Sequence, residues 1–287
     1  MSNNIDKKLL FFDIDGTLVG FDGKMRESTM KALKMARQNG HEIFIASGRS
    51  YGQIYPFLLD FGFDGIICAA GAFVEYNGKE IFRDTFGNRR MKFLMNFFMD
   101  NQTNFYIQTK DFSVLPKSQL YSFVKTMRPG LESDNEKEME ENLKKILGDL
   151  VLDDDIKNYY KKYDVAETIV YYDCPYSINE MRRMMGPMGM KVTRSSFTKP
   201  SDYMGELTLL GLNKSNGIKT ICDYLHMDIK DTICFGDGPN DIDMLDAAGY
   251  SVCMGNGDSA AKERADLIAD DIENDGIYKA MDKLGLI

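Results

Sequence analysis

The chain has 287 residues, more than a single hydrophobic core usually needs, so two domains are expected. Its 44% hydrophobic and 28% charged residues are typical of a globular protein. The formal net charge of −9 and the lack of a basic stripe argue against a nucleic-acid binder, whose affinity depends on Lys and Arg neutralising phosphates.

The lengths of the apolar runs and the spacing of the cysteines indicate the cellular compartment of the protein. No apolar stretch of signal-peptide length follows the charged residues 6–8, and no segment approaches the ~18 apolar residues of a membrane span. The cysteines are odd in number and lack CxxC spacing, which is typical of reduced, buried thiols. They are Cys68, Cys174, Cys222, Cys234 and Cys253. We therefore expect a cytoplasmic protein with no membrane partner.

The first part of the chain alternates between strand-like and helix-like patterns. Apolar runs at 8–13, 42–46 and 65–69 predict strands, and apolar spacing predicts helices at 28–39 and 51–61. This βαβαβ order predicts a parallel sheet with helices on both faces.

The alternation stops after an Asn77-Gly78 hairpin turn. Between about residues 89 and 205 helix-like and strand-like stretches follow one another without a regular order, which favours a separate α+β domain. The predicted helices are 91–101, 133–147 and 177–185, and the predicted strands are 105–109, 168–173, 191–194 and 206–210.

Alternation resumes near Asn213, where strands are predicted at 232–235 and 251–254. Helices are predicted at 215–225, 242–248, 260–265 and 276–284. We therefore predict one α/β core made of residues 1–83 and 211–287, interrupted by an inserted domain of residues 84–210. Asp84 and Leu210 mark the expected hinges.

Asp13 and Asp15 directly follow the first apolar strand, in the run Phe11-Phe12-Asp13-Ile14-Asp15-Gly16-Thr17. Ligands of open α/β sheets bind at the carboxyl ends of the strands. Two carboxylates in one site resist joint ionisation unless a cation lies between them, so the pair implies a divalent metal. Asp and Gly are also common turn formers, which is the alternative explanation.

Two further candidates involve single polar side chains. Ser47-Gly48-Arg49 follows the second strand, where a hydroxyl and nearby amides can hold phosphate oxygens. Lys214 opens a helix, where a cation is unfavourable unless an anion lies beside it. Taken alone, the tripeptide could be an ordinary turn, and Lys214 is better explained as a solvent-facing lysine.

The fourth candidate is the turn Gly236-Asp237-Gly238-Pro239-Asn240-Asp241, which follows a further strand. Its oxygen-bearing side chains suit a hard cation such as Mg²⁺. A simple helix cap would account for Asn240 or Asp241, and leaves the rest of the set unexplained.

In order and spacing these four features resemble the haloacid dehalogenase (HAD) superfamily, and within it the Cof-type phosphatases with a type IIB cap. Asp13-Ile14-Asp15-Gly16-Thr17 is similar to the first motif, Ser47 to the second, Lys214 to the third, and Gly236-Asp237 with Asn240-Asp241 to the fourth. Met254-Gly255-Asn256 and Asn274-Asp275-Gly276 extend the resemblance. The resemblance implies a Rossmann-like HAD core with an inserted α+β cap of type C2B.

The resemblance also implies a mechanism. Asp13 would attack phosphorus and form an aspartyl-phosphate, and Asp15 would act as acid and base. Mg²⁺ would bind Asp13, the backbone carbonyl of Asp15, and Asp237. The phosphate and substrate would be held by Ser47, Gly48, Arg49, Lys214 and Asn240, with Asp241 behind them. The departure from the family is Ala69-Ala70-Gly71-Ala72, where Cof-type proteins often have Asn-Gly.

The implied substrate is a small phosphorylated metabolite such as a sugar phosphate, pyridoxal phosphate or FMN. A phosphosugar mutase shares the Asp-x-Asp chemistry and stays open as an alternative, as does a phosphate-binding module without catalysis. Aromatic residues of the inserted domain could stack on a substrate ring, namely Tyr121, Phe123, Tyr171 and Tyr203. The protein is expected to be a monomer or homodimer.

Overall fold

The computed structural model describes residues 6–194 and 201–287, which form two compact units. The first contains residues 1–48, 55–83 and 213–287, and the second contains 49–54 and 84–212. Residues 1–5 of the predicted core and 195–200 of the predicted insertion lie outside the described residues. None of the helices in the described ranges combines the length and the apolar character needed to cross a membrane.

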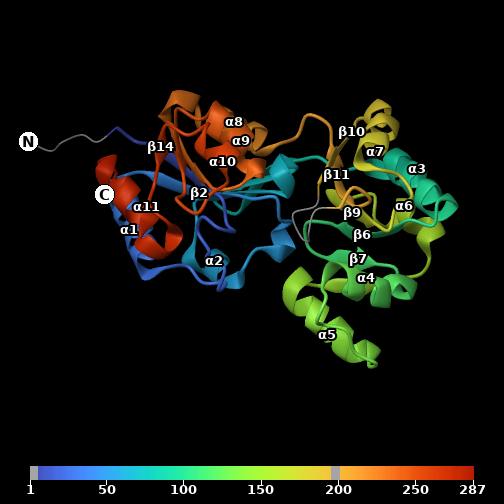
Figure 1. Cartoon of the computed structure of the whole chain (residues 1–287). Coiled ribbons are helices and arrows are strands. Elements are labelled where there is room, and N and C mark those ends of the chain that lie inside the picture. The colour runs from blue at the N-terminus through green and yellow to red at the C-terminus, as the bar shows by residue number, and fades with distance from the viewer. Residues whose placement is uncertain (1–5, 195–200) are drawn as a thin grey trace, which may run out of the picture. The chain divides into compact units, whose positions relative to one another are not determined.

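The first unit is built on an eight-stranded sheet, drawn mostly in blue and orange in Figure 1. Its order is β14-β13-β12-β1-β2-β3-β4-β5, parallel from β14 to β3 and antiparallel from β3 to β5. The strands are β1 (Leu9–Phe12), β2 (Glu42–Ala46), β3 (Gly65–Cys68), β4 (Phe73–Tyr76), β5 (Lys79–Arg83), β12 (Thr232–Gly236), β13 (Tyr250–Cys253) and β14 (Leu267–Ile268).

Helices cover both faces of this sheet, as a run of buried residues in a central parallel strand requires. All four residues of β1 are buried, and Phe11 lies in one apolar cluster with Phe44 of β2 and Ile218 of α8. Helices α1 and α11 pack against each other. The helices are α1 (Glu27–Gln38), α2 (Pro56–Phe61), α8 (Lys214–Leu225), α9 (Ile242–Ala247), α10 (Ser259–Lys262) and α11 (Gly276–Lys283).

The second unit is an α+β structure with a six-stranded sheet of order β10-β11-β9-β6-β7-β8, antiparallel except for the pair β7–β8. Two apolar clusters fill it, one around Phe98 and Phe105 and the other around Phe123 and Leu143. The strands are β6 (Asn104–Gln108), β7 (Ser113–Leu115), β8 (Leu150–Leu152), β9 (Thr168–Tyr172), β10 (Met190–Thr193) and β11 (Gly205–Leu209). The helices are α3 (Gly87–Asp100), α4 (Leu120–Met127), α5 (Glu136–Leu147), α6 (Tyr159–Lys162) and α7 (Ile178–Met185).

The structure differs from the predictions in three instructive ways. The predicted helix 51–61 is interrupted, because Pro56 begins α2 and the residue before a proline disfavours helical geometry. Residues 49–54, which the sequence analysis included in the core, pack with the second unit, where Gly52 N donates to Lys110 O at 2.7 Å. Helix α4 was missed, since its eight residues carry only a short amphipathic pattern.

Candidate active site

Parallel pairing brings the predicted motifs of the first unit to one edge of its sheet. Asp13 and Ser47 follow β1 and β2, Asp237 follows the last residue of β12, and Lys214 begins α8. Because β1 lies between β2 and β12 and runs parallel to both, their carboxyl ends meet. The topology therefore collects residues that are more than 200 positions apart in the chain.

Lys214 is the centre of the site. Its Nζ lies 2.5 Å from Oδ1 of Asp13 and 2.5 Å from Oδ1 of Asp241, and only 1% of the lysine is exposed. A lysine at a helix N-terminus opposes the helix dipole, and these two carboxylates supply the missing anionic partners. Asp13 is 5% exposed and Asp241 fully buried, so the three charges interact with little solvent screening.

Asp241 also shapes the turn that carries Asp237. Its Oδ2 accepts hydrogen bonds from the backbone N–H groups of Asp237 and Gly238, both at 2.9 Å. Both carboxylate oxygens of Asp241 are therefore engaged, one by Lys214 and one by the turn. Asp241 therefore holds both Lys214 and the turn that carries Asp237 in place.

Asp237 is held by the loop that follows Asp13. The hydroxyl of Thr17 donates to Asp237 Oδ1 at 2.9 Å. Gly16 has a φ of +89°, and a Cβ built on it would lie 2.7 Å from Cγ of Asp237. Only glycine fits here, because both the backbone conformation and the neighbouring carboxylate exclude a side chain. Thr17 was quoted in the first motif, but no role was predicted for it.

Burial and mutual repulsion shift the protonation of these groups. Burial, together with the nearby carboxylate of Asp241, raises the pKa of Asp13 to about 8 against the pull of Lys214. Burial and Asp241 also raise the pKa of Asp237 to about 6. Burial lowers the pKa of Lys214, but Asp13 and Asp241 raise it by more, so the lysine stays charged. The carboxylates outnumber the single cation, and the protein alone does not neutralise them.

The donor set fits a hard divalent cation. One carboxylate oxygen from each of Asp13, Asp237 and Asp241 lies within 4.8 Å of the others. Of these residues, Asp13 and Asp237 each have an oxygen that accepts no hydrogen bond within the described residues, whereas both oxygens of Asp241 are engaged. Oxygen ligands at this spacing suit a cation such as Mg²⁺.

Ser47 and the start of α8 are joined through the loop after β3. Ser47 is buried, and its carbonyl accepts from Ala70 N at 3.1 Å. Gly71, at φ +95°, would place a Cβ 3.0 Å from the carbonyl carbon of Asn213 and closer still to its oxygen. The Asn213 side chain caps α8 by accepting from Asn216 N at 2.9 Å. The Ala69–Ala72 loop, which departs from the family pattern, therefore packs against both phosphate-binding candidates.

The remaining predicted site residues make fewer contacts with Lys214 and the aspartates around it. Asp15 is exposed, and its Oδ1 lies 3.4 Å from the hydroxyl of Tyr55, a partner with no local sequence signal. Gly48 is exposed, and Arg49 belongs to the second unit, where it donates to Gln53 O at 3.2 Å. Asn240 is exposed and makes no side-chain hydrogen bond in the described part of the chain.

The structure also shows where the predicted substrate-stacking aromatic residues and the cysteines lie. Phe123 and Tyr171 are buried in the core of the second unit, whereas Tyr121 and Tyr203 are more than half exposed. Only the latter pair is therefore available at the surface. All five cysteines are buried, as predicted, and no disulfide joins any of them within residues 6–194 and 201–287.

Comparisons with known proteins agree with this geometry. The model of the haloacid dehalogenase-like hydrolase family matches residues 10–281. The provisionally named phosphatase YkrA of Bacillus subtilis (strain 168) is 26% identical over 283 residues, covering 99% of this chain and all of YkrA. The 5-amino-6-(5-phospho-D-ribitylamino)uracil phosphatase YcsE of the same organism is 27% identical over 286 residues, covering 97% of this chain and 96% of YcsE.

A solved structure of a HAD subclass IIB sugar phosphatase has a TM-score of 0.74 and 26% identity, and the match covers 98% of this chain and all of the other. The fold class predicted from the sequence, a parallel-sheet α/β core with a cap of this subclass, is confirmed. The match to the family model across most of the chain confirms the predicted resemblance: the chain belongs to the family of haloacid dehalogenase-like hydrolases.

Proposed function

We propose that this hydrolase is a Mg²⁺-dependent phosphatase that cleaves phosphate monoesters of small metabolites through an aspartyl-phosphate intermediate. The observation that carries the proposal is the position of Asp13, with Lys214 at 2.5 Å and Asp237 and Asp241 beside it. An anionic nucleophile can approach an anionic phosphate only where cations offset their repulsion. The named relatives YkrA and YcsE and the sugar phosphatase support the same reaction class.

Each side chain has a distinct role in this proposal. A carboxylate oxygen of Asp13 attacks phosphorus, and the bond from phosphorus to the ester oxygen breaks. Asp15 gives its proton to that leaving oxygen and then takes one from the water that hydrolyses the aspartyl-phosphate, which restores both carboxyl groups. Lys214 and Ser47 hold the phosphoryl oxygens and stabilise their charge in the transition state.

Mg²⁺ would be held by Asp13, the backbone carbonyl of Asp15, and Asp237, and when bound it neutralises charge between nucleophile and phosphate. Asp241 orients Lys214 and the Asp237 turn through the bonds described above. Gly48, Arg49 and Asn240 are assigned to phosphate or substrate contacts from the family pattern.

The second unit is proposed to select the leaving group. Sugar phosphates, pyridoxal phosphate and FMN differ mainly in that group, and the exposed Tyr121 and Tyr203 offer rings on which a sugar or heterocycle could stack. The proposed nucleophile, the acid and base, and the proposed metal ligands all belong to the first unit. Substitutions of these tyrosines should therefore change the preference among substrates more than the reaction itself.

The proposal is tested with p-nitrophenyl phosphate and a panel of phosphorylated metabolites, with release of inorganic phosphate as the readout. Wild-type protein should release phosphate with Mg²⁺, lose activity in EDTA and recover it when Mg²⁺ is restored. With p-nitrophenyl phosphate, Asp15→Asn should accumulate phosphorylated protein, because the nitrophenolate leaves without a proton while the attack of water still needs the base. A product in which the phosphoryl group has moved within a sugar, without free phosphate, would instead identify a mutase.

A further inference from the structure

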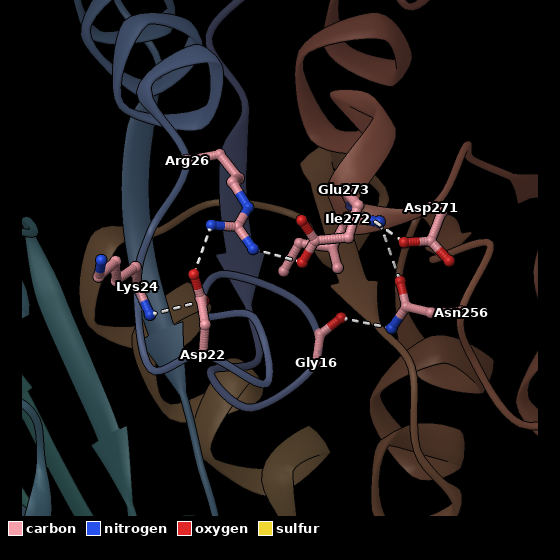
Figure 2. Close-up of polar contacts among 8 residues, drawn as sticks. All are labelled: Gly16, Asp22, Lys24, Arg26, Asn256, Asp271, Ile272 and Glu273. Atoms are coloured by element: carbon pink, nitrogen blue, oxygen red, sulfur yellow. Dashed lines mark hydrogen bonds and ion pairs between the residues drawn. The ribbon is translucent and has the colours of Figure 1, made fainter.

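Asn256 joins two segments that are remote in sequence, the loop after Asp15 and the C-terminal segment before α11. Its Nδ2 donates to the carbonyl of Gly16 at 2.8 Å, and its Oδ1 accepts from the backbone N–H of Ile272 at 3.0 Å (Figure 2). A backbone N–H can only donate and a carbonyl can only accept. The two partners therefore fix which end of the amide faces Gly16.

The bond to Asn256 completes the fixation of Gly16. The Gly16 N–H donates to Val19 O at 2.8 Å, so both peptide planes that meet at this residue are held. Because a trans peptide is planar, the carbonyl of Asp15 must point opposite to the Gly16 N–H. The Gly16 N–H bond to Val19 sets the direction of that carbonyl, a proposed metal ligand, and the Asn256 bond holds the peptide plane on the other side of Gly16.

The fixed peptide also leads to Asp237. Thr17 follows the bonded Gly16 carbonyl, and its hydroxyl donates to Asp237 Oδ1 at 2.9 Å. Rotation of the peptide between Gly16 and Thr17 would move this hydroxyl and release one oxygen of Asp237. The Asn256 amide thus restrains Gly16, which lies between two of the three proposed metal ligands along the loop: the Asp15 carbonyl precedes it, and Thr17, which holds Asp237, follows it.

We propose that Asn256 is a positioning residue that holds the Asp15 carbonyl and the Asp237 carboxylate in the geometry that binds Mg²⁺. The inference rests on the proposed function, because it adds a positioning residue to the proposed metal site. Partners behind metal ligands commonly change metal affinity or activity by about 10-fold to 100-fold when they are removed. Asn256 lies in this position without touching a proposed ligand side chain itself.

An ion pair between Arg26 and Glu273 joins the same two segments, so its effect can be compared with that of the Asn256 hydrogen bonds. Arg26 donates to Asp22 at 2.9 Å and also pairs with Glu273, the residue after Ile272 (Figure 2). This ion pair ties the loop to the C-terminal segment but leaves the peptide planes at Gly16 untouched. If attachment of the loop were all that mattered, losing Arg26 would affect the metal as much as losing Asn256.

The test is Asn256→Asp, which keeps the shape and the acceptor for Ile272 but removes the donor to Gly16. The dissociation constant of Mg²⁺ is measured by calorimetry on the full chain, with circular dichroism to establish folding. We expect it to rise about 10-fold or more. The kcat should recover at high Mg²⁺, and the KM for the phosphate ester should stay within twofold.

Asn39→Asp is the matched control, since Asn39 Nδ2 also donates to a backbone carbonyl, that of Leu286, at 3.0 Å. This variant and Arg26→Ala should bind Mg²⁺ as the wild type does. An unchanged Mg²⁺ affinity in Asn256→Asp, or an equal loss in Asn39→Asp or Arg26→Ala, would overturn the inference. If Asn256→Asp does not fold, Thr17→Val tests the next link and should weaken Mg²⁺ binding, whereas Thr17→Ser should preserve it. Wild-type protein that binds no Mg²⁺ would refute the metal site itself, before any variant is compared.

Discussion

The Nζ atom of Lys214 lies 2.5 Å from Oδ1 of Asp13, so the proposed nucleophile is already paired with a buried cation before any substrate arrives. The same ammonium group binds Asp241 at the same distance. Lys214 therefore holds together two carboxylates that would repel each other without it, and both the stability of the site and its chemistry depend on this one side chain.

Replacement of this lysine should lower both the stability of the fold and the phosphatase activity, and the two effects can be separated. Lys214→Met leaves Asp13 and Asp241 buried without a cation, and the free energy of unfolding should fall by about 3–5 kcal/mol, as when one partner of a buried ion pair is removed. Phosphatase activity should fall at least 100-fold, the scale of losing one donor to the transition state. Chemical denaturation and phosphate release measure the two effects.

The double variant Lys214→Met/Asp241→Asn separates the effect on stability from the effect on activity. An asparagine at 241 can still accept from the backbone N–H groups of Asp237 and Gly238, but it carries no charge. Part of the stability should return while activity stays lost. Wild-type stability in the single variant would contradict the ion-pair assignment.

Asp13→Asn should abolish turnover without destabilising the metal-free protein. The raised pKa of Asp13 means that its ionised form is disfavoured in the folded state, so a neutral side chain of the same shape relieves repulsion. In EDTA at pH 8 the Tm of this variant should equal or exceed that of the wild type. A clear fall in Tm, or retained activity, would be incompatible with the proposed role.

Stabilisation by Mg²⁺ should increase with pH. The pKa values of Asp13 and Asp237 in the metal-free fold are raised to about 8 and about 6 from an ordinary value of 3.8. Between 3.8 and these values the folded protein binds protons that the unfolded chain has lost, so metal-free stability falls as pH rises through this window. Mg²⁺ must displace those protons. We therefore expect a larger Mg²⁺-induced rise in Tm at pH 8 than at pH 6, and a shift that is equal at both would argue against these carboxylates as ligands.

Gly71→Ala should disturb the start of α8. The new Cβ would overlap the Asn213 carbonyl, in addition to the left-handed backbone at φ +95°. Gly78→Ala is the matched control, because it has a φ of +75° and no atom within 4 Å of the added Cβ. The control should lose about 1–2 kcal/mol, the cost of left-handed backbone for a residue other than glycine. Gly71→Ala should lose more and also lower kcat, since Lys214 directly follows Asn213. Equal losses in both variants would show that the contact is unimportant.

Much of this site was predictable because strong local patterns mark it. Apolar runs that end in Asp13, Ser47 or Asp237 identify strands with polar ends, and a parallel sheet brings such ends together. The position of Lys214 at a helix start left open either an anionic partner or a solvent-facing lysine, and the structure shows the anionic partners. The alternating order of elements also predicted the parallel core strands, apart from the two-residue edge strand β14 and shifts of a few residues at element ends.

Other contacts could not be predicted from local patterns, although Asn256 itself lies in the Met254-Gly255-Asn256 stretch that extends the family resemblance. The hydroxyl of Tyr55 meets Asp15 across 40 positions, and the amide of Asn256 meets Gly16 across 240. Residues 51–54 were predicted as the start of a core helix, yet residues 49–54 belong to the second unit, where Gly52 N donates to Lys110 O between β6 and β7. Each of these contacts depends on where a chain segment passes after the sheet has formed.

The sequence by itself determined the chemistry of this protein, because residue types at strand ends limit what a site can bind and do. It named Asp13, Lys214, Asp237 and Asp241 without any coordinates. The tertiary structure decided how those groups are held: Asp241 behind Lys214, Thr17 on Asp237, and Asn256 on the Gly16 carbonyl. These supporting contacts join side chains to backbone atoms of distant segments, and the order of strands in the sheet, not local pattern, decides which segments meet.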